Sequence, residues 1–151
     1  MKKILLLLIL VYGQLFALER GSTLKIYHEI FSALFSKTTI FVYTNDKEYR
    51  DVFSYSKRIF LTNELKKADI VLITDKRSLK SILYRLEVNT NVSKKPILFV
   101  TNYHFLKESD YIVGAFYWRK GRSQLLFIKK RLDAQNITLP RDYQKFIIDE
   151  L

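Results

Sequence analysis

The sequence predicts an α/β domain, with a mainly parallel sheet, flanking helices, a closing β-hairpin and a C-terminal helix. Apolar runs at 38–44, 68–74 and 96–101 are short and continuous, as in strands that are buried on both faces. Segments with apolar residues at helical spacing alternate with these runs, which favours crossover connections. Four Gly and two Pro in 151 residues are too few for an all-β chain with many tight turns.

The N-terminal part of the predicted fold is a helix, a strand and a second helix. Apolar side chains recur on one face of residues 22–35, which predicts the first helix. The strand at 38–44 follows it. A short helix is then expected from Lys47, because Asn45 and Glu48 have the spacing of a capping box.

The middle of the chain continues the alternation. Residues 57–61 predict a short strand, 68–74 a strong strand and 76–86 an amphipathic helix. The next strand, 96–101, begins with Pro96, at a position where a missing N–H does least harm. We therefore expect these strands to be joined by helical crossovers.

The last third predicts a hairpin and a helix. Strands are expected at 111–118 and 123–128, joined by an Arg-Lys-Gly-Arg turn in which Gly121 supplies a positive φ. A terminal helix is expected over 140–149, with Pro140 at its first position.

The N-terminus has the pattern of a secretory signal peptide at residues 1–17. Two lysines precede an unbroken apolar run at 4–11, and Ala17 offers a small residue for cleavage. The run is shorter than the roughly 20 residues that a transmembrane helix needs. We therefore expect a periplasmic protein whose mature part, 18–151, is a single domain. An uncleaved N-terminal anchor is the alternative.

Composition restricts the partners. The chain has no cysteine, so packing alone holds it together outside the cytoplasm. Its formal charge is +11, and loss of the two leader lysines lowers it to +9. The cations are scattered along the sequence, which favours a solvated surface, and we expect no nucleic-acid partner. The sequence leaves open whether the chain forms homo-oligomers.

Catalytic and metal-binding patterns in the sequence are weak, and a divergent enzyme whose site is assembled only in three dimensions is a further alternative. Thiol chemistry is excluded, and the only histidines are His28, which we expect on a helix surface, and His104 in a loop. No paired histidines, Gly-x-Ser-x-Gly motif or phosphate loop occurs. We therefore predict a protein that is not an enzyme and holds no metal or cofactor.

Polar residues follow three of the predicted strands. Asn45 and Asp46 follow the first, Asp75 follows the strand at 68–74, and Asn102 follows the strand that begins at Pro96. In an open parallel sheet these ends share one edge, where ligands usually bind. The residues are thus a candidate small-ligand site. The simpler interpretation is that they cap the elements that follow.

The most unusual surface candidate is the hairpin. Its residues Tyr117, Trp118, Arg119, Lys120 and Arg122 are of types that dominate binding hot spots or carry positive charge. Because neighbouring strand residues face opposite ways, we expect one ring to point inward and the other outward. This surface is the candidate partner-binding site.

The order of segments from Leu24 to Ile148 resembles the YfiR-like family of exported bacterial proteins. The likeness rests on the basic-apolar strand at 57–59, the Pro-led strand at 95–101 and the hairpin from Gly114. The first helix lacks the Trp-Pro that commonly follows it in the family.

The resemblance implies a regulatory function without catalysis. Members of that family are associated with repressing membrane-bound diguanylate cyclases through their periplasmic sensor regions. By this analogy, the chain binds an inner-membrane signalling protein. The alternative is a periplasmic small-molecule-binding domain that uses the strand-end polar residues.

Overall fold

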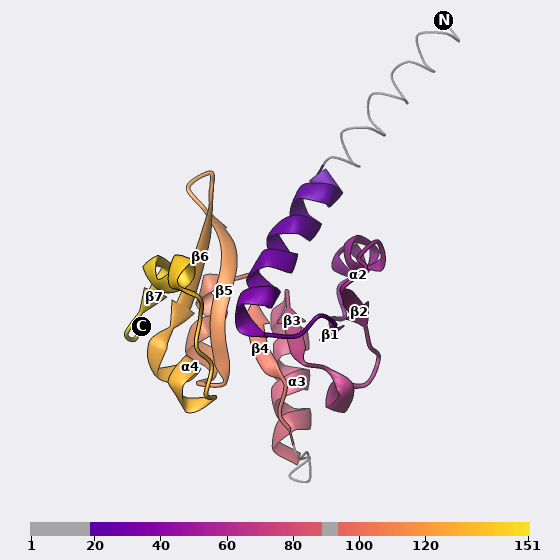
Figure 1. The fold of residues 1–151 in the computed structure, drawn as a ribbon. Coiled ribbons are helices and arrows are strands. Elements are labelled where there is room, and N and C mark those ends of the chain that lie inside the picture. The colour runs from indigo at the N-terminus through magenta and orange to yellow at the C-terminus, as the bar shows by residue number, and fades with distance from the viewer. Residues whose placement is uncertain (1–18, 89–93) are drawn as a thin grey trace, which may run out of the picture.

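A computed structural model describes residues 19–88 and 94–151 of the chain (Figure 1). The signal peptide expected at 1–17 lies outside the described residues. In order, the elements are a helix at 19–34, β1 (Ile40–Tyr43), α2 (Lys47–Ser54), β2 (Ile59–Leu61), the 3-10 helix η1 (Leu65–Lys67), β3 (Ile70–Ile73), α3 (Lys76–Val88), β4 (Ile97–Val100), the 3-10 helix η2 (Tyr103–Glu108), β5 (Ile112–Arg119), β6 (Arg122–Ile128), α4 (Lys129–Ala134), the 3-10 helix η3 (Arg141–Phe146) and β7 (Ile147–Ile148).

The strands form one sheet in the order β2-β1-β3-β4-β5-β6-β7. All neighbouring pairs are parallel except β5 and β6, which form the antiparallel hairpin. The predicted α/β class with a mainly parallel sheet is therefore confirmed. Strands β1, β3 and β4 all end at one edge of the sheet, which we call the carboxyl edge. The opposite edge, where these strands begin, is the amino edge.

Helices cover both faces of the sheet, and alternation along each strand divides the core in two. In β3, Ile70 and Leu72 pack with the helix at 19–34 and with α2, whereas Val71 and Ile73 pack with α3. All four side chains are buried. This two-sided burial is why the strand has a continuous apolar sequence.

The hairpin extends past the carboxyl edge. Val100, the last residue of β4, pairs with Ala115, so the four residues from Phe116 to Arg119 continue beyond it. Gly114 lies where strands β5 and β6 approach closely, because a Cβ at this position would meet the carbonyl oxygen of Leu126 at 2.5 Å. Figure 1 shows the hairpin turn at the same end of the molecule as the start of the helix at 19–34.

The C-terminal region differs from the sequence prediction. The helix expected over 140–149 is a 3-10 helix that ends at Phe146, and Ile147 and Ile148 form β7 beside β6. Their β-branched side chains favour this extended pairing. The short helix α4 was not predicted, because no element was expected between the hairpin and residue 140.

The residue expected to cap α2 is also wrong: Asn45 was predicted to form a capping box with Glu48. Asp46, not Asn45, caps α2, and its carboxylate accepts hydrogen bonds from the backbone N–H groups of Glu48 and Tyr49.

None of the helices in the described part of the chain is both long and apolar enough to cross a membrane.

Candidate functional site

The carboxyl edge brings the strand-end polar residues to one side of the sheet, as expected from the parallel topology. Three of the four residues use a side-chain oxygen to accept a hydrogen bond from the local backbone. Asp75 accepts hydrogen bonds from the N–H (2.9 Å) and the hydroxyl (2.6 Å) of Ser78, at the start of α3. The bond from the Ser78 hydroxyl, followed by that from its N–H, lowers the pKa of Asp75.

Asn102 has the same kind of local function at the end of β4. Its side-chain oxygen accepts the N–H of His104 at 2.9 Å and so begins η2. Capping thus accounts for Asp46, Asp75 and Asn102. Asn45 is exposed, and no hydrogen bond of its side chain is found in the described part of the chain. A small-ligand site formed by these four residues stays a prediction.

Asn102 also contributes to a larger feature, an open hollow of about 500 Å³ at the carboxyl edge. We call this hollow the aromatic groove; its lining residues are Thr101, Asn102, Tyr103, His104, Tyr117, Trp118 and Arg119. It joins Asn102, one of the strand-end polar residues, to the last residues of β5, just before the hairpin turn. Asn45, Asp46 and Asp75 do not line it.

Tyr103 is the centre of the groove. Its ring centroid lies 5.6 Å from that of Tyr117 and 5.3 Å from that of His104. The guanidinium carbon of Arg119 lies 5.9 Å from the same ring, within the range of a cation–π contact. Tyr117 and Arg119 meet Tyr103 together because residues two apart on a strand share a face. The sequence analysis singled out Tyr117 and Arg119 but missed Tyr103 as their partner.

Trp118 faces the other side of the hairpin. It lies on the face of Phe116, which packs against the helix at 19–34, and its own exposed fraction is 74%. Tyr117 is half-buried and packs against the core on the α3 side. The structure thus places one ring inward and one outward.

The turn is a tight two-residue connection. Lys120 has a φ of 51° and Gly121 a φ of 74°, and Arg119 pairs directly with Arg122. Two positive φ values are the geometry of a type I′ hairpin turn, which suits the twist of the flanking strands. The sequence analysis identified Gly121 but not the positive φ of Lys120. Arg119, Lys120 and Arg122 are exposed, and none of them has an ion pair within the described residues.

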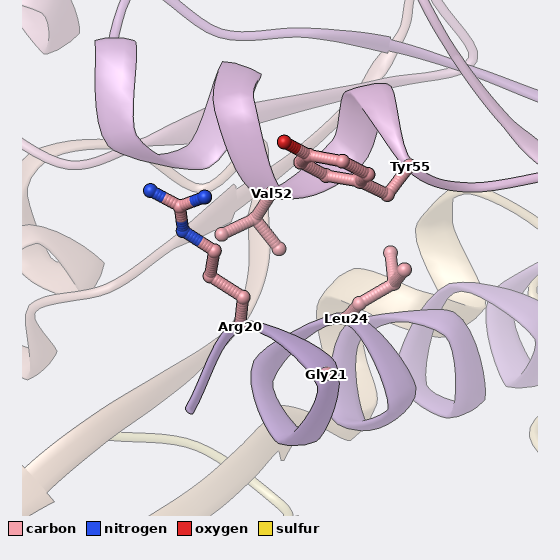
Figure 2. Close-up of a pocket in the computed structure, with 5 residues that line it drawn as sticks. All are labelled: Arg20, Gly21, Leu24, Val52 and Tyr55. Carbon is pink, nitrogen blue, oxygen red and sulfur yellow. The ribbon is translucent and has the colours of Figure 1, made fainter. Parts of the chain in front are cut away.

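A second hollow, of about 330 Å³, lies between the helix at 19–34 and α2 (Figure 2). Leu24, Val52 and the ring of Tyr55 form its apolar lining, and the backbone at Gly21 leaves it open. Arg20 borders it and pairs with Asp51 at 3.2 Å. Among the described residues that line it, no nucleophile stands beside an acid–base pair.

The histidines add no catalytic geometry. His104 is exposed at the groove. His28 is half-buried rather than on the helix surface as expected, and its Nε2 is enclosed without a hydrogen-bond partner among the described residues. Within the described residues, no group of three or more acidic or histidine side chains is placed to hold a metal ion.

Comparison with known proteins adds support for the fold alone. No family model and no curated protein matches the chain. A solved structure of a conserved domain protein from Vibrio cholerae O1 biovar El Tor is similar, with a TM-score of 0.56 at 11% identity. The match covers 82% of this chain and 58% of the other, so the chain spans little more than half the length of that protein.

Proposed function

We propose that this chain is an exported, non-enzymatic protein that binds and regulates a membrane-bound signalling protein. The observation that carries the proposal is the aromatic groove, in which the half-buried rings of Tyr103 and Tyr117 and the exposed side chain of Arg119 form one aromatic and cationic surface. Tyrosine and arginine are enriched in the residues that dominate protein interfaces. The resemblance to the YfiR-like family supports the same class of function and suggests a diguanylate-cyclase-type sensor in the inner membrane.

The charge of the groove indicates the kind of partner. Between Asp110 and Asp133 the chain contains no acidic residue. Arg119 lies in the groove and Lys120 and Arg122 follow it at the hairpin turn, and none of the three has an ion pair among the described residues. An acidic periplasmic segment fits such a surface, because complementary charges speed the encounter and aromatic contacts slow dissociation.

Capture of the partner from membranes tests the proposal. The mature protein is immobilised and exposed to solubilised membranes of its source organism, and the captured proteins are identified by mass spectrometry. We expect a membrane signalling protein with a cyclase-type catalytic domain. Tyr103→Ala and Arg119→Ser should each weaken binding of that protein by roughly 30-fold, as loss of a hot-spot side chain does.

Two matched controls separate the groove from general effects. Tyr84 is an exposed tyrosine on α3, and Arg58 is an exposed arginine at the amino edge. Tyr84→Ala and Arg58→Ser should bind as the wild type does. If the two groove variants retain full binding, or if only proteins unrelated to signalling are captured, the proposal is wrong.

A further inference from the structure

The tip of the hairpin projects past the carboxyl edge of the sheet. Trp118 is 74% exposed, and no ring contact or hydrogen bond of its side chain is found within the described residues. It is the only tryptophan in the chain. A tryptophan side chain has an apolar ring and a polar N–H group, and it is therefore favoured at boundaries between an apolar and a hydrated environment.

The charges around Trp118 fit one such environment. Arg119, Lys120 and Arg122 follow it within four residues, and none has an ion pair among the described residues. Tryptophan concentrates at the headgroup level of membranes, and cations near an anionic bilayer add affinity one by one. The tight turn holds these side chains together at one point.

The arrangement of the fold is consistent with contact between the hairpin turn and a membrane. The hairpin turn and the start of the helix at 19–34 lie at the same end of the molecule (Figure 1). In the sequence, that helix follows a largely apolar stretch at 4–16, which would hold this end of the molecule at a membrane if it is kept as an N-terminal anchor. The aromatic groove lies at this end too, because it is formed by residues at the carboxyl edge and by the last residues of β5 before the hairpin turn.

We propose that the hairpin tip, defined as Trp118, Lys120 and Arg122, docks onto the surface of an anionic phospholipid bilayer. The Trp118 ring enters the headgroup layer, and the two cations contact lipid phosphates. Such docking orients the groove toward a membrane-bound partner, but it requires no partner protein.

The only tryptophan makes the test direct. The mature wild-type protein is titrated with vesicles of equal parts phosphatidylcholine and phosphatidylglycerol, and with vesicles of phosphatidylcholine alone. We expect the emission of Trp118 to shift to shorter wavelength with the anionic vesicles only. The shift should disappear near 1 M salt, where the Debye length is about 3 Å.

A matched pair of variants locates the contact. Lys120→Asn with Arg122→Ser removes the tip cations and preserves the turn, because asparagine accepts a positive φ. The control, Lys57→Asn with Arg58→Ser, removes the same charges from exposed residues at the amino edge. In co-sedimentation, the tip variant should bind anionic vesicles roughly 30-fold more weakly than the wild type, and the control variant should bind nearly as well.

Three results would overturn the docking proposal. The Trp118 emission could stay unchanged with anionic vesicles, which the wild type alone reveals even if a variant does not fold. The control variant could lose as much binding as the tip variant, in which case net charge is responsible. The emission could respond to a captured protein and not to vesicles, in which case the tip is part of a protein interface. The groove variants Tyr103→Ala and Arg119→Ser are measured on the captured protein and not on vesicles, so a failure of the docking proposal and a failure of the proposed function can be told apart.

Discussion

The two edges of the sheet use similar side chains in opposite ways. At the amino edge, the buried carboxylate of Asp69 accepts hydrogen bonds from the Nζ atoms of Lys37 at 2.6 Å and Lys94 at 3.2 Å, and from the backbone N–H of Phe41 at 3.1 Å. At the carboxyl edge, the cations of the hairpin have no acidic partner among the described residues.

Two arginines make the contrast sharper. Arg131 has a side chain only 11% exposed, and its Nη1 donates to the carbonyl oxygens of Leu106, Ser109 and Ile112. Its Nη2 pairs with Asp110 at 3.1 Å. Arg122 is exposed at the turn. The amino edge is therefore satisfied internally, and we interpret it as structural, whereas the carboxyl edge leaves charge and aromatic surface for other molecules.

Replacing the buried arginine should have the largest effect. Arg131→Met leaves three carbonyl oxygens without their donor beside an apolar side chain, and we expect it to lower the free energy of unfolding by about 3 kcal/mol. Arg122→Met, the matched change at the hairpin tip, should alter it by less than about 0.5 kcal/mol. Urea unfolding of both variants measures the difference. Equal losses would show that the two edges do not differ as described.

The Asp69 cluster should give a smaller effect that depends on pH. Burial by itself raises the pKa of Asp69, but the hydrogen bonds from Lys37, the Phe41 N–H and Lys94 outweigh burial and lower the pKa below its ordinary value of 3.8. A lowered pKa in the folded state stabilises the protein above the unfolded-state pKa. This stabilisation is lost as the pH falls through the folded-state value.

Asp69→Asn should therefore cost about 1–2 kcal/mol at neutral pH, less than for a fully buried pair because both lysines are about half exposed. The deficit should shrink as the pH falls below about 4, toward the lowered folded-state pKa at which the wild-type carboxylate becomes protonated. Unfolding curves measured across this range decide the matter. A deficit that is independent of pH would mean that the charge of Asp69 does not contribute to the free energy of unfolding.

The central sheet could be predicted from the sequence because its strands are buried on both faces. The runs around Ile70 and Ile97 are apolar without interruption, and such runs have few alternatives. The C-terminal region was mispredicted because Ile147 and Ile148 fit either a helix or a strand. Only pairing with β6, a contact with a distant part of the chain, decides between them.

The candidate site could be predicted only in part, for a similar reason. Local spacing identified the turn and the alternation of Tyr117 and Trp118. The contact between Tyr103 and Tyr117 depends on β4 and β5 lying side by side, which spacing along the chain does not reveal. The burial of Arg131 was missed in the same way, because the sequence Lys129-Lys130-Arg131 gives no sign that the third side chain points inward.

The smallest expected effect on stability is that of the hairpin ring. Trp118 buries only about a quarter of its surface, and its cross-strand neighbour is the short side chain of Ser123. Trp118→Ala should therefore lower the free energy of unfolding by less than about 1 kcal/mol, whereas truncating a buried aromatic such as Phe31 costs roughly 3–5 kcal/mol. Thermal unfolding followed by circular dichroism measures both, since the signal does not depend on tryptophan. A loss near that of Phe31→Ala would mean that the Trp118 ring packs against the fold in solution. The ring would then be unavailable to a bilayer, and the contrast between the two edges would fail at its most exposed residue.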